Sequence, residues 1–291
     1  MVAAADAIDS TSGDGGSTAF VLGGGGALGA HEVGMLRALA DAGIIPDLIL
    51  GTSVGAINGA LFAADPTADG ARRLNELWRE FNRNDIFGGP LLRQVGTLAR
   101  TRTYTQAFGP LRDMLAQTLP VSRIEELFVP FECVAASIER AAEHWFTEGP
   151  LAEAVLASCA VPGILPPVRI DGESYIDGGI VNSIPVSRAV ALGARTIYVL
   201  QVGRLERPLR APRWPWEVGL VAFEVARRHR FQSDLASMPA GVELHVMPTG
   251  GSAAPAFSDL PSQLRNRRVS VGLQRRIDSA YEASLRYLEH R

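Results

Sequence analysis

Residues 47–64 read DLILGTSVGAINGALFAA, which is a short apolar run typical of a buried strand, then a tight turn, then an alanine-rich helix. The turn, Gly51–Gly55, has the Gly-x-Ser-x-Gly pattern of a nucleophile elbow. In such an elbow Ser53 has strained backbone angles, and the two glycines leave room where side chains would clash. The serine also lies at a helix N-terminus, which favours the alkoxide and oxyanion of acyl transfer. The alternative is a plain strand-to-helix turn with a helix-capping serine.

The residues upstream repeat this arrangement. Residues 19–22 are apolar and run into Gly23–Gly26, and a helix is expected over about 27–42, with Gly43 as its stop. Strand, turn and helix therefore occur twice in the first 65 residues. This order predicts an α/β fold in which helices cover a parallel sheet.

The glycine-rich turn between the first strand and helix is a candidate anion site. It contains Gly24, Gly25, Gly26 and Gly29, and its exposed N–H groups could form an oxyanion hole or hold a dinucleotide phosphate. A dinucleotide site needs an acidic residue at the far end of the next strand, to hold the ribose. That place is occupied by the elbow, so the pattern favours an oxyanion loop.

Asp177-Gly178-Gly179 follows another short predicted strand. Asp-Gly is a common turn pair, so these residues alone indicate only a turn. A serine nucleophile, however, needs a base, and a carboxylate at the end of a core strand can serve if burial raises its pKa.

Together these segments resemble the patatin-like phospholipase family over about residues 20–194. The likeness rests on the glycine loop, the elbow about 25 residues later and the Asp177 turn. It also includes residues 157–167, ASCAVPGILPP, which look like the helix and proline-rich turn before the family's acid strand.

The resemblance implies a three-layer α/β/α fold with a mostly parallel central sheet. It further implies a lipid acyl-ester hydrolase with a Ser–Asp dyad and no cofactor or metal. Ser53 would be the nucleophile and Asp177 the general base and acid, and N–H groups of Gly24–Gly26 would bind the oxyanion. Gly29, Gly51, Gly55, Gly178 and Gly179 would be the motif glycines. Many family members carry arginine where this chain has Leu28, so any electrostatic help from that side chain is absent.

Three other function classes fit parts of the sequence. A Ser-His-Asp esterase would use His229 or His245, in the chain order of α/β-hydrolases. Against it, His229 lies in an arginine cluster typical of a solvated helix face, and His245 alternates with apolar residues in a predicted strand. A non-catalytic lipid-binding or regulatory protein could also keep this fold. A nicotinamide-dependent enzyme is the weakest alternative.

Composition excludes several further classes. The chain has 291 residues and a net charge of −3, which argues against nucleic-acid binding. All 28 basic residues are arginine, so Schiff-base lysine chemistry and a Walker P-loop are excluded. Two cysteines and the absence of a long apolar run predict a cytoplasmic protein without a transmembrane helix.

The chain is expected to comprise a disordered tail (1–18), a catalytic domain (20–194) and a basic C-terminal region (204–291) that packs on or extends the core. Residues 204–216 predict an irregular loop rich in arginine, proline and tryptophan. This loop and the cluster Arg227–Arg230 either contact an anionic membrane transiently or form an ordinary solvated surface. A basic amphipathic helix over about 263–291 is expected to pack on the core.

Overall fold

A computed structural model describes residues 17–83, 100–101, 103–202, 208–251 and 269–291. The predicted tail, apart from its last two residues, and residues 204–207 and 263–268 lie outside the described residues. The strands are β1 (Thr18–Leu22), β2 (Leu48–Thr52), β3 (Phe131–Ser137), β4 (Ala142–Phe146), β5 (Val168–Ile170), β6 (Glu173–Asp177), β7 (Thr196–Leu200) and β8 (Glu243–Val246).

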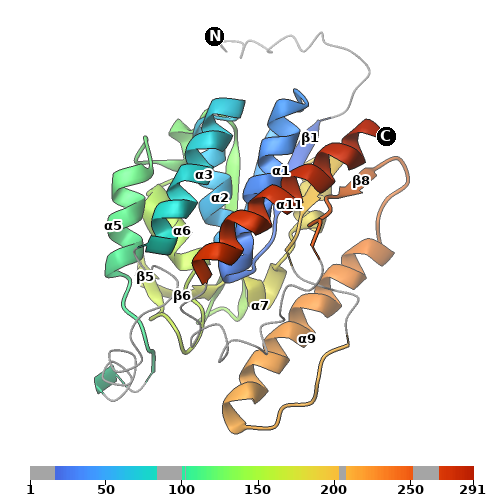
Figure 1. Cartoon of the computed structure of the whole chain (residues 1–291). Coiled ribbons are helices and arrows are strands. Elements are labelled where there is room, and N and C mark those ends of the chain that lie inside the picture. The colour runs from blue at the N-terminus through green and yellow to red at the C-terminus, as the bar shows by residue number, and fades with distance from the viewer. Residues whose placement is uncertain (1–16, 84–99, 102, 203–207, 252–268) are drawn as a thin grey trace, which may run out of the picture.

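Helices connect and cover these strands (Figure 1). They are α1 (Ala30–Asp41), α2 (Val54–Ala64), α3 (Ala68–Arg83), α5 (Gly109–Thr118), α6 (Leu151–Ser158), α7 (Gly179–Asn182), α8 (Val186–Ala191), α9 (Pro215–Ala236) and α11 (Val269–Glu289), with 3-10 turns η1 (Gly26–Gly29) and η2 (Ile124–Glu126). No helix in the described part of the chain is long and apolar enough to cross a bilayer.

The described strands form one eight-stranded sheet in the order β5-β6-β3-β2-β1-β7-β8, with β4 paired to β3. Pairing is parallel through the centre, where β1 lies between β2 and β7, and β2 lies against β3. The pairs that β4, β5 and β6 form are antiparallel. The sheet is therefore mixed and mostly parallel, as expected from the repeated strand-turn-helix order.

Both faces of the sheet carry a hydrophobic core, which confirms the three-layer α/β/α fold. Phe20 and Leu22 of β1 pack in one core with α1, α2, α3, α6 and α11. Ala19 and Val21 point to the opposite face, where the core includes residues of α8 and Phe231 of α9. Strand β1 is buried on both sides because a central parallel strand is covered by helices above and below.

The described part of the C-terminal region adds to this same structure. Strand β8 pairs in parallel with β7 and extends the sheet. Helix α11 lies across α1 (Figure 1), with Leu273 and Ile277 in the core beside it. The irregular stretch predicted to end at residue 216 ends earlier, because Pro215 at the first position already has the fixed φ that suits a helix start, and α9 begins there.

Candidate active site

The predicted elbow forms at the junction of β2 and α2. Ser53 has φ 56° and ψ −123°, a left-handed conformation that costs a non-glycine residue about 1–3 kcal/mol. A Cβ on Gly51 would lie 2.6 Å from the Ala56 Cα, and one on Gly55 would lie 2.4 Å from the Leu22 carbonyl oxygen. Only glycine fits at these two positions, which is why the sequence folds into so sharp a turn.

Strand β3 brings Ser53 and Asp177 together. Strand β2 pairs with β3 up to Thr52 opposite Val134, and β6 pairs with the next stretch of β3, where Asp177 lies opposite Ala135. Since β4 occupies the other edge of β3 over this whole stretch, β2 and β6 must share one edge, one after the other. The end of β2 and the end of β6 therefore meet, although 124 residues separate the serine from the aspartate.

The two side chains are joined by a short hydrogen bond. Ser53 Oγ donates to Asp177 Oδ2 at 2.6 Å, and the Gly179 N–H donates to Asp177 Oδ1 at 2.7 Å. Asp177 is 1% exposed and Ser53 is 8% exposed. The carboxylate is thus aimed at the serine hydroxyl and held from its other oxygen by the backbone.

Burial sets the acidity of Asp177. Loss of water raises the pKa of its carboxyl from 3.8 to about 6, while the bonds from Ser53 and Gly179 and the positive charge of Arg227 oppose that rise. The group is therefore largely ionised at neutral pH yet basic enough to take a proton, which is the range that suits a general base.

The glycine loop lies beside the serine. A Cβ on Gly24 would lie 3.4 Å from the Ser53 Cβ. The Gly24 N–H, however, donates to the Ser183 carbonyl at 3.0 Å, whereas no hydrogen-bond partner is found among the described residues for the amides of Gly25 and Gly26. This bond narrows the predicted oxyanion donors from three amides to those of Gly25 and Gly26.

Two residues at the end of α6, Ser158 and Cys159, form hydrogen bonds with the backbone of Ser53. The Ser53 N–H donates to Ser158 Oγ at 2.9 Å, and Ser158 Oγ donates to the Val134 carbonyl at 2.7 Å. The Cys159 thiol lies 3.1 Å from the Ser53 carbonyl oxygen. The sequence marked this segment only as a helix end, and its one pointer to the site was its place in the family resemblance.

The two candidate histidines, His229 and His245, have contacts and exposure that suit structural roles. His229 is exposed on α9, and His245 is buried in β8, where it contacts Glu243 and Tyr287. Both agree with the structural roles that the sequence indicated. Within the described ranges, no hydrogen bond joins a histidine to Ser53 or Asp177, and no group of three or more His, Cys, Asp or Glu side chains is arranged to hold a metal ion.

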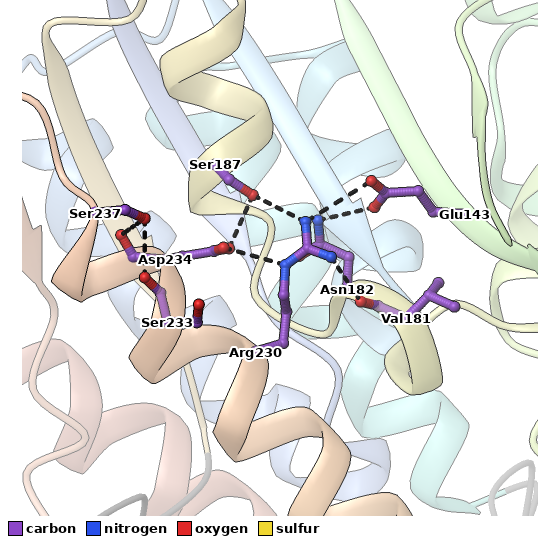
Figure 2. A network of polar contacts seen from close by, with 8 residues as sticks. All are labelled: Glu143, Val181, Asn182, Ser187, Arg230, Ser233, Asp234 and Ser237. Atoms are coloured by element: carbon purple, nitrogen blue, oxygen red, sulfur yellow. Dashed lines mark hydrogen bonds and ion pairs between the residues drawn. The ribbon is translucent and has the colours of Figure 1, made fainter.

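Helix α9 departs from the sequence interpretation. The cluster Arg227–Arg230 was expected to face water or a membrane, but Arg227 is 4% exposed and its Nη1 donates to the Gly24 carbonyl at 3.1 Å. The Arg230 side chain is 37% exposed and contacts Ser187, Asp234 and Glu143 (Figure 2). The reason is that α9 packs against α7, so Arg227 meets the glycine loop instead of solvent.

The chain resembles known proteins over its first two thirds. A family model for patatin-like phospholipase matches residues 20–190. Patatin-like phospholipase domain-containing protein 7 of Mus musculus is 32% identical over 200 residues, covering 65% of this chain and 14% of that protein. Lysophospholipase nte1 of Aspergillus terreus is 33% identical over 198 residues, covering 65% of this chain and 12% of that protein.

This chain thus spans only a small part of the length of those relatives. Among solved structures, VipD from Legionella pneumophila aligns with a TM-score of 0.47 and 15% identity, over 94% of this chain and 67% of that one. The family match covers more than half of this chain and includes the elbow, the glycine loop and the Asp177 turn. The chain belongs to the patatin-like phospholipase family, a family of carboxylic ester hydrolases.

Proposed function

We propose that this chain hydrolyses acyl esters of lipids, with Ser53 as the nucleophile and Asp177 as general base and then general acid. The observation that carries the proposal is the 2.6 Å hydrogen bond between Ser53 Oγ and Asp177 Oδ2. The names of the relatives, phospholipase and lysophospholipase, support a phospholipid or lysophospholipid as the substrate class.

The first half of the reaction transfers the acyl group to the enzyme. Asp177 accepts the Ser53 proton as Oγ attacks the ester carbonyl, and the amides of Gly25 and Gly26 donate to the resulting oxyanion. When the intermediate collapses, the C–O bond to the alcohol breaks, and Asp177 returns its proton to the departing alkoxide. The products of this half are a free alcohol and an acyl ester on Ser53.

The second half regenerates the serine. Asp177 removes a proton from a water molecule, which attacks the acyl carbonyl through the same oxyanion site. The Ser53–acyl bond then breaks, and Asp177 gives its proton to Ser53 Oγ as the fatty acid leaves. One carboxylate thus serves both halves without a histidine.

The experiment is an ester panel, from p-nitrophenyl acetate through long-chain esters to lysophospholipid and phospholipid, run on the wild type and on the variants His229→Gln and His245→Gln. We expect the wild type to hydrolyse members of the panel and both variants to stay within about tenfold of its rate. Loss of a true triad base would instead lower the rate by a factor on the order of 10³ or more. A larger loss in either variant would support the Ser-His-Asp alternative. A wild type that is inactive on every ester would support a non-catalytic role.

We further propose that the outer face of α9 contacts an anionic lipid surface. Trp214, Val218 and Val225 are 57%, 53% and 51% exposed, and their spacing puts them along one side of the helix and its start. Exposed Arg210 and Arg213 precede them. Apolar side chains next to arginines suit a bilayer that carries negative headgroups.

Vesicle sedimentation checks this contact. The chain should bind phosphatidylcholine vesicles containing phosphatidylserine more tightly than phosphatidylcholine alone, and added salt should weaken that binding. The double variant Arg210→Gln/Arg213→Gln should lose the preference, whereas Arg195→Gln, which removes an exposed arginine outside α9 and the segment before it, should keep it. Equal binding of the wild type to neutral and anionic vesicles would rule the contact out.

A further inference from the structure

Helix α9 carries a buried ion pair next to the glycine loop. Arg227 and Glu224 are 4% and 3% exposed, and Arg227 Nε lies 3.3 Å from Glu224 Oε1. Removing two charges from water costs several kcal/mol per ion, and well-packed apolar residues often stabilise a fold as well or better. Stabilisation of the fold is therefore a weak reason for an arginine at position 227.

The contact that matters most is with one peptide unit of the loop. Arg227 Nη1 donates to the Gly24 carbonyl oxygen at 3.1 Å. In a planar trans peptide the carbonyl and the following N–H point in opposite directions. Because the next residue is Gly25, a bond that fixes the Gly24 carbonyl also fixes the direction of the Gly25 N–H, one of the two amides without a partner.

A glycine-glycine peptide has much freedom to rotate, since neither residue has a Cβ to restrict it. The hydrogen bond from Arg227 restricts this rotation. It is made to the carbonyl of the peptide, opposite to the N–H that would face the substrate. A charged donor on a carbonyl also polarises the peptide and strengthens its N–H as a donor. Both effects favour binding of an oxyanion at the Gly25 amide.

Helix α9 is itself held in place one turn further along (Figure 2). Arg230 Nε donates to Asp234 Oδ1 at 3.1 Å, and Arg230 Nη2 donates to Ser187 Oγ at 3.3 Å. Arg230 Nη1 also reaches the Val181 carbonyl of α7, the helix that directly follows the Asp177 turn. This network ties α9 to the segment that positions the carboxylate, so Arg227 has a fixed place relative to both the loop and Asp177.

We propose that Arg227 is a positioning residue of the acyl-transfer site, which orients the Gly25 amide toward the oxyanion. The inference rests on the proposed function. It assigns a role in the reaction to a helix that lies outside the matched residues 20–190.

The effect on Asp177 has a defined sign. The groups that face this carboxylate are the Ser53 hydroxyl, the Cys159 thiol at the end of α6 and Arg227 of α9, with Glu224 behind the arginine. Among them, only Arg227 brings a positive charge, and that charge lowers the pKa of Asp177. Without it the pKa rises above about 6, so less carboxylate is present at neutral pH.

The test is the pH dependence of kcat/KM on a short p-nitrophenyl ester. Arg227→Met keeps the apolar part of the side chain and removes the charged guanidinium group. Arg227→Lys keeps the positive charge, and Arg228→Met is the matched control. Arg228 lies on the same helix and also contacts Glu224, at 3.2 Å. Thermal unfolding and far-UV circular dichroism show whether each variant is folded.

We expect Arg227→Met to lower kcat by about ten- to hundredfold with little change in KM, and to move the acidic limb of the pH profile to higher pH. Arg227→Lys should leave the limb at its wild-type position, and Arg228→Met should change neither quantity. If Arg227→Met does not fold, the double variant Glu224→Gln/Arg227→Met removes both buried charges and takes its place, with the same expected shift.

A folded variant without Arg227 that keeps the wild-type kcat overturns this inference while leaving the Ser53–Asp177 chemistry intact. A wild type that is inactive on all esters instead overturns the proposed function, and the inference with it. The two failures are therefore distinguishable by the wild-type rate alone.

Discussion

Ser53→Ala is expected to lower kcat for ester hydrolysis by on the order of 10³-fold or more while the protein remains folded. The substitution removes the oxygen that donates to Asp177 Oδ2 and whose side chain lies beside the glycine loop. The backbone bonds that hold the elbow, from Ser53 N–H to Ser158 Oγ and from Ala56 N–H to the Ser53 carbonyl, do not involve the hydroxyl. Stability should therefore fall by about 1–3 kcal/mol, the cost of leaving one buried acceptor without its donor.

Initial rates on the best ester of the panel, together with the melting temperature, check this result. Ser174→Ala is the matched control, because Ser174 lies in β6, the same strand as Asp177, but on its distant part. That variant should retain wild-type turnover. A folded Ser53→Ala protein with more than a tenth of the wild-type rate would show that another group performs the attack.

Asp177→Asn is expected to lower kcat by about 10²- to 10⁴-fold, the contribution of a well-placed general base. An amide cannot accept the serine proton, although it preserves the shape of the side chain. Its oxygen can still accept the Gly179 N–H, and the Ser53 hydroxyl can rotate to accept from its NH₂ group. The loss of rate should therefore occur without loss of structure.

The same substitution should make the protein more stable at neutral and alkaline pH. The folded pKa of Asp177 is raised from 3.8 to about 6, so between these values the folded state holds more protons than the unfolded state. Stability of the wild type therefore falls as the pH rises through this window, by about 3 kcal/mol in total, and stays lower above it.

Thermal unfolding at a series of pH values measures this cost. Asp177→Asn should melt at a higher temperature than the wild type at pH 8, and the difference should shrink as the pH falls toward 4. A variant that is less stable than the wild type at pH 8 would mean that the carboxylate stabilises the fold. The combination of lost rate and gained stability is typical of a group kept for catalysis.

The elbow was predictable from sequence because everything that shapes it is local. The strand, the two glycines and the following helix are contiguous, and Gly51 and Gly55 are required by contacts within the turn and with the neighbouring strand. The α/β class followed for a similar reason, since two adjacent strand-turn-helix units already indicate a parallel sheet covered by helices, whereas the three-layer arrangement was implied by the family resemblance.

The positions of Asp177 and Arg227 beside the elbow could not be predicted from the local sequence. An Asp-Gly pair indicates a turn anywhere, and only the shared edge of β3 places this one beside the elbow. Arg227 sits in an arginine cluster that is typical of a solvated helix, yet its partner, Gly24, is 203 residues away. The buried positions 224, 227, 231 and 234 of α9 follow a helical period, and this pattern was the one local indication of an inward face.

The oxyanion loop was predictable in outline only. The run of glycines indicates free amides, but which of them remain free depends on a bond from Gly24 to the carbonyl of Ser183, far along the chain. The supporting hydroxyl of Ser158 likewise depends on how α6 packs against β3.

The most direct test of the account is to treat the chain with a fluorophosphonate probe and locate the adduct by intact mass and peptide mapping. We expect one adduct per chain, on the peptide that contains Ser53, formed more slowly below about pH 6 as Asp177 becomes protonated. Ser53→Ala should carry none, and Asp177→Asn should label far more slowly than the wild type. An enzyme that hydrolyses esters while Ser53 stays unmodified, or that carries the adduct on a different residue, would contradict the account.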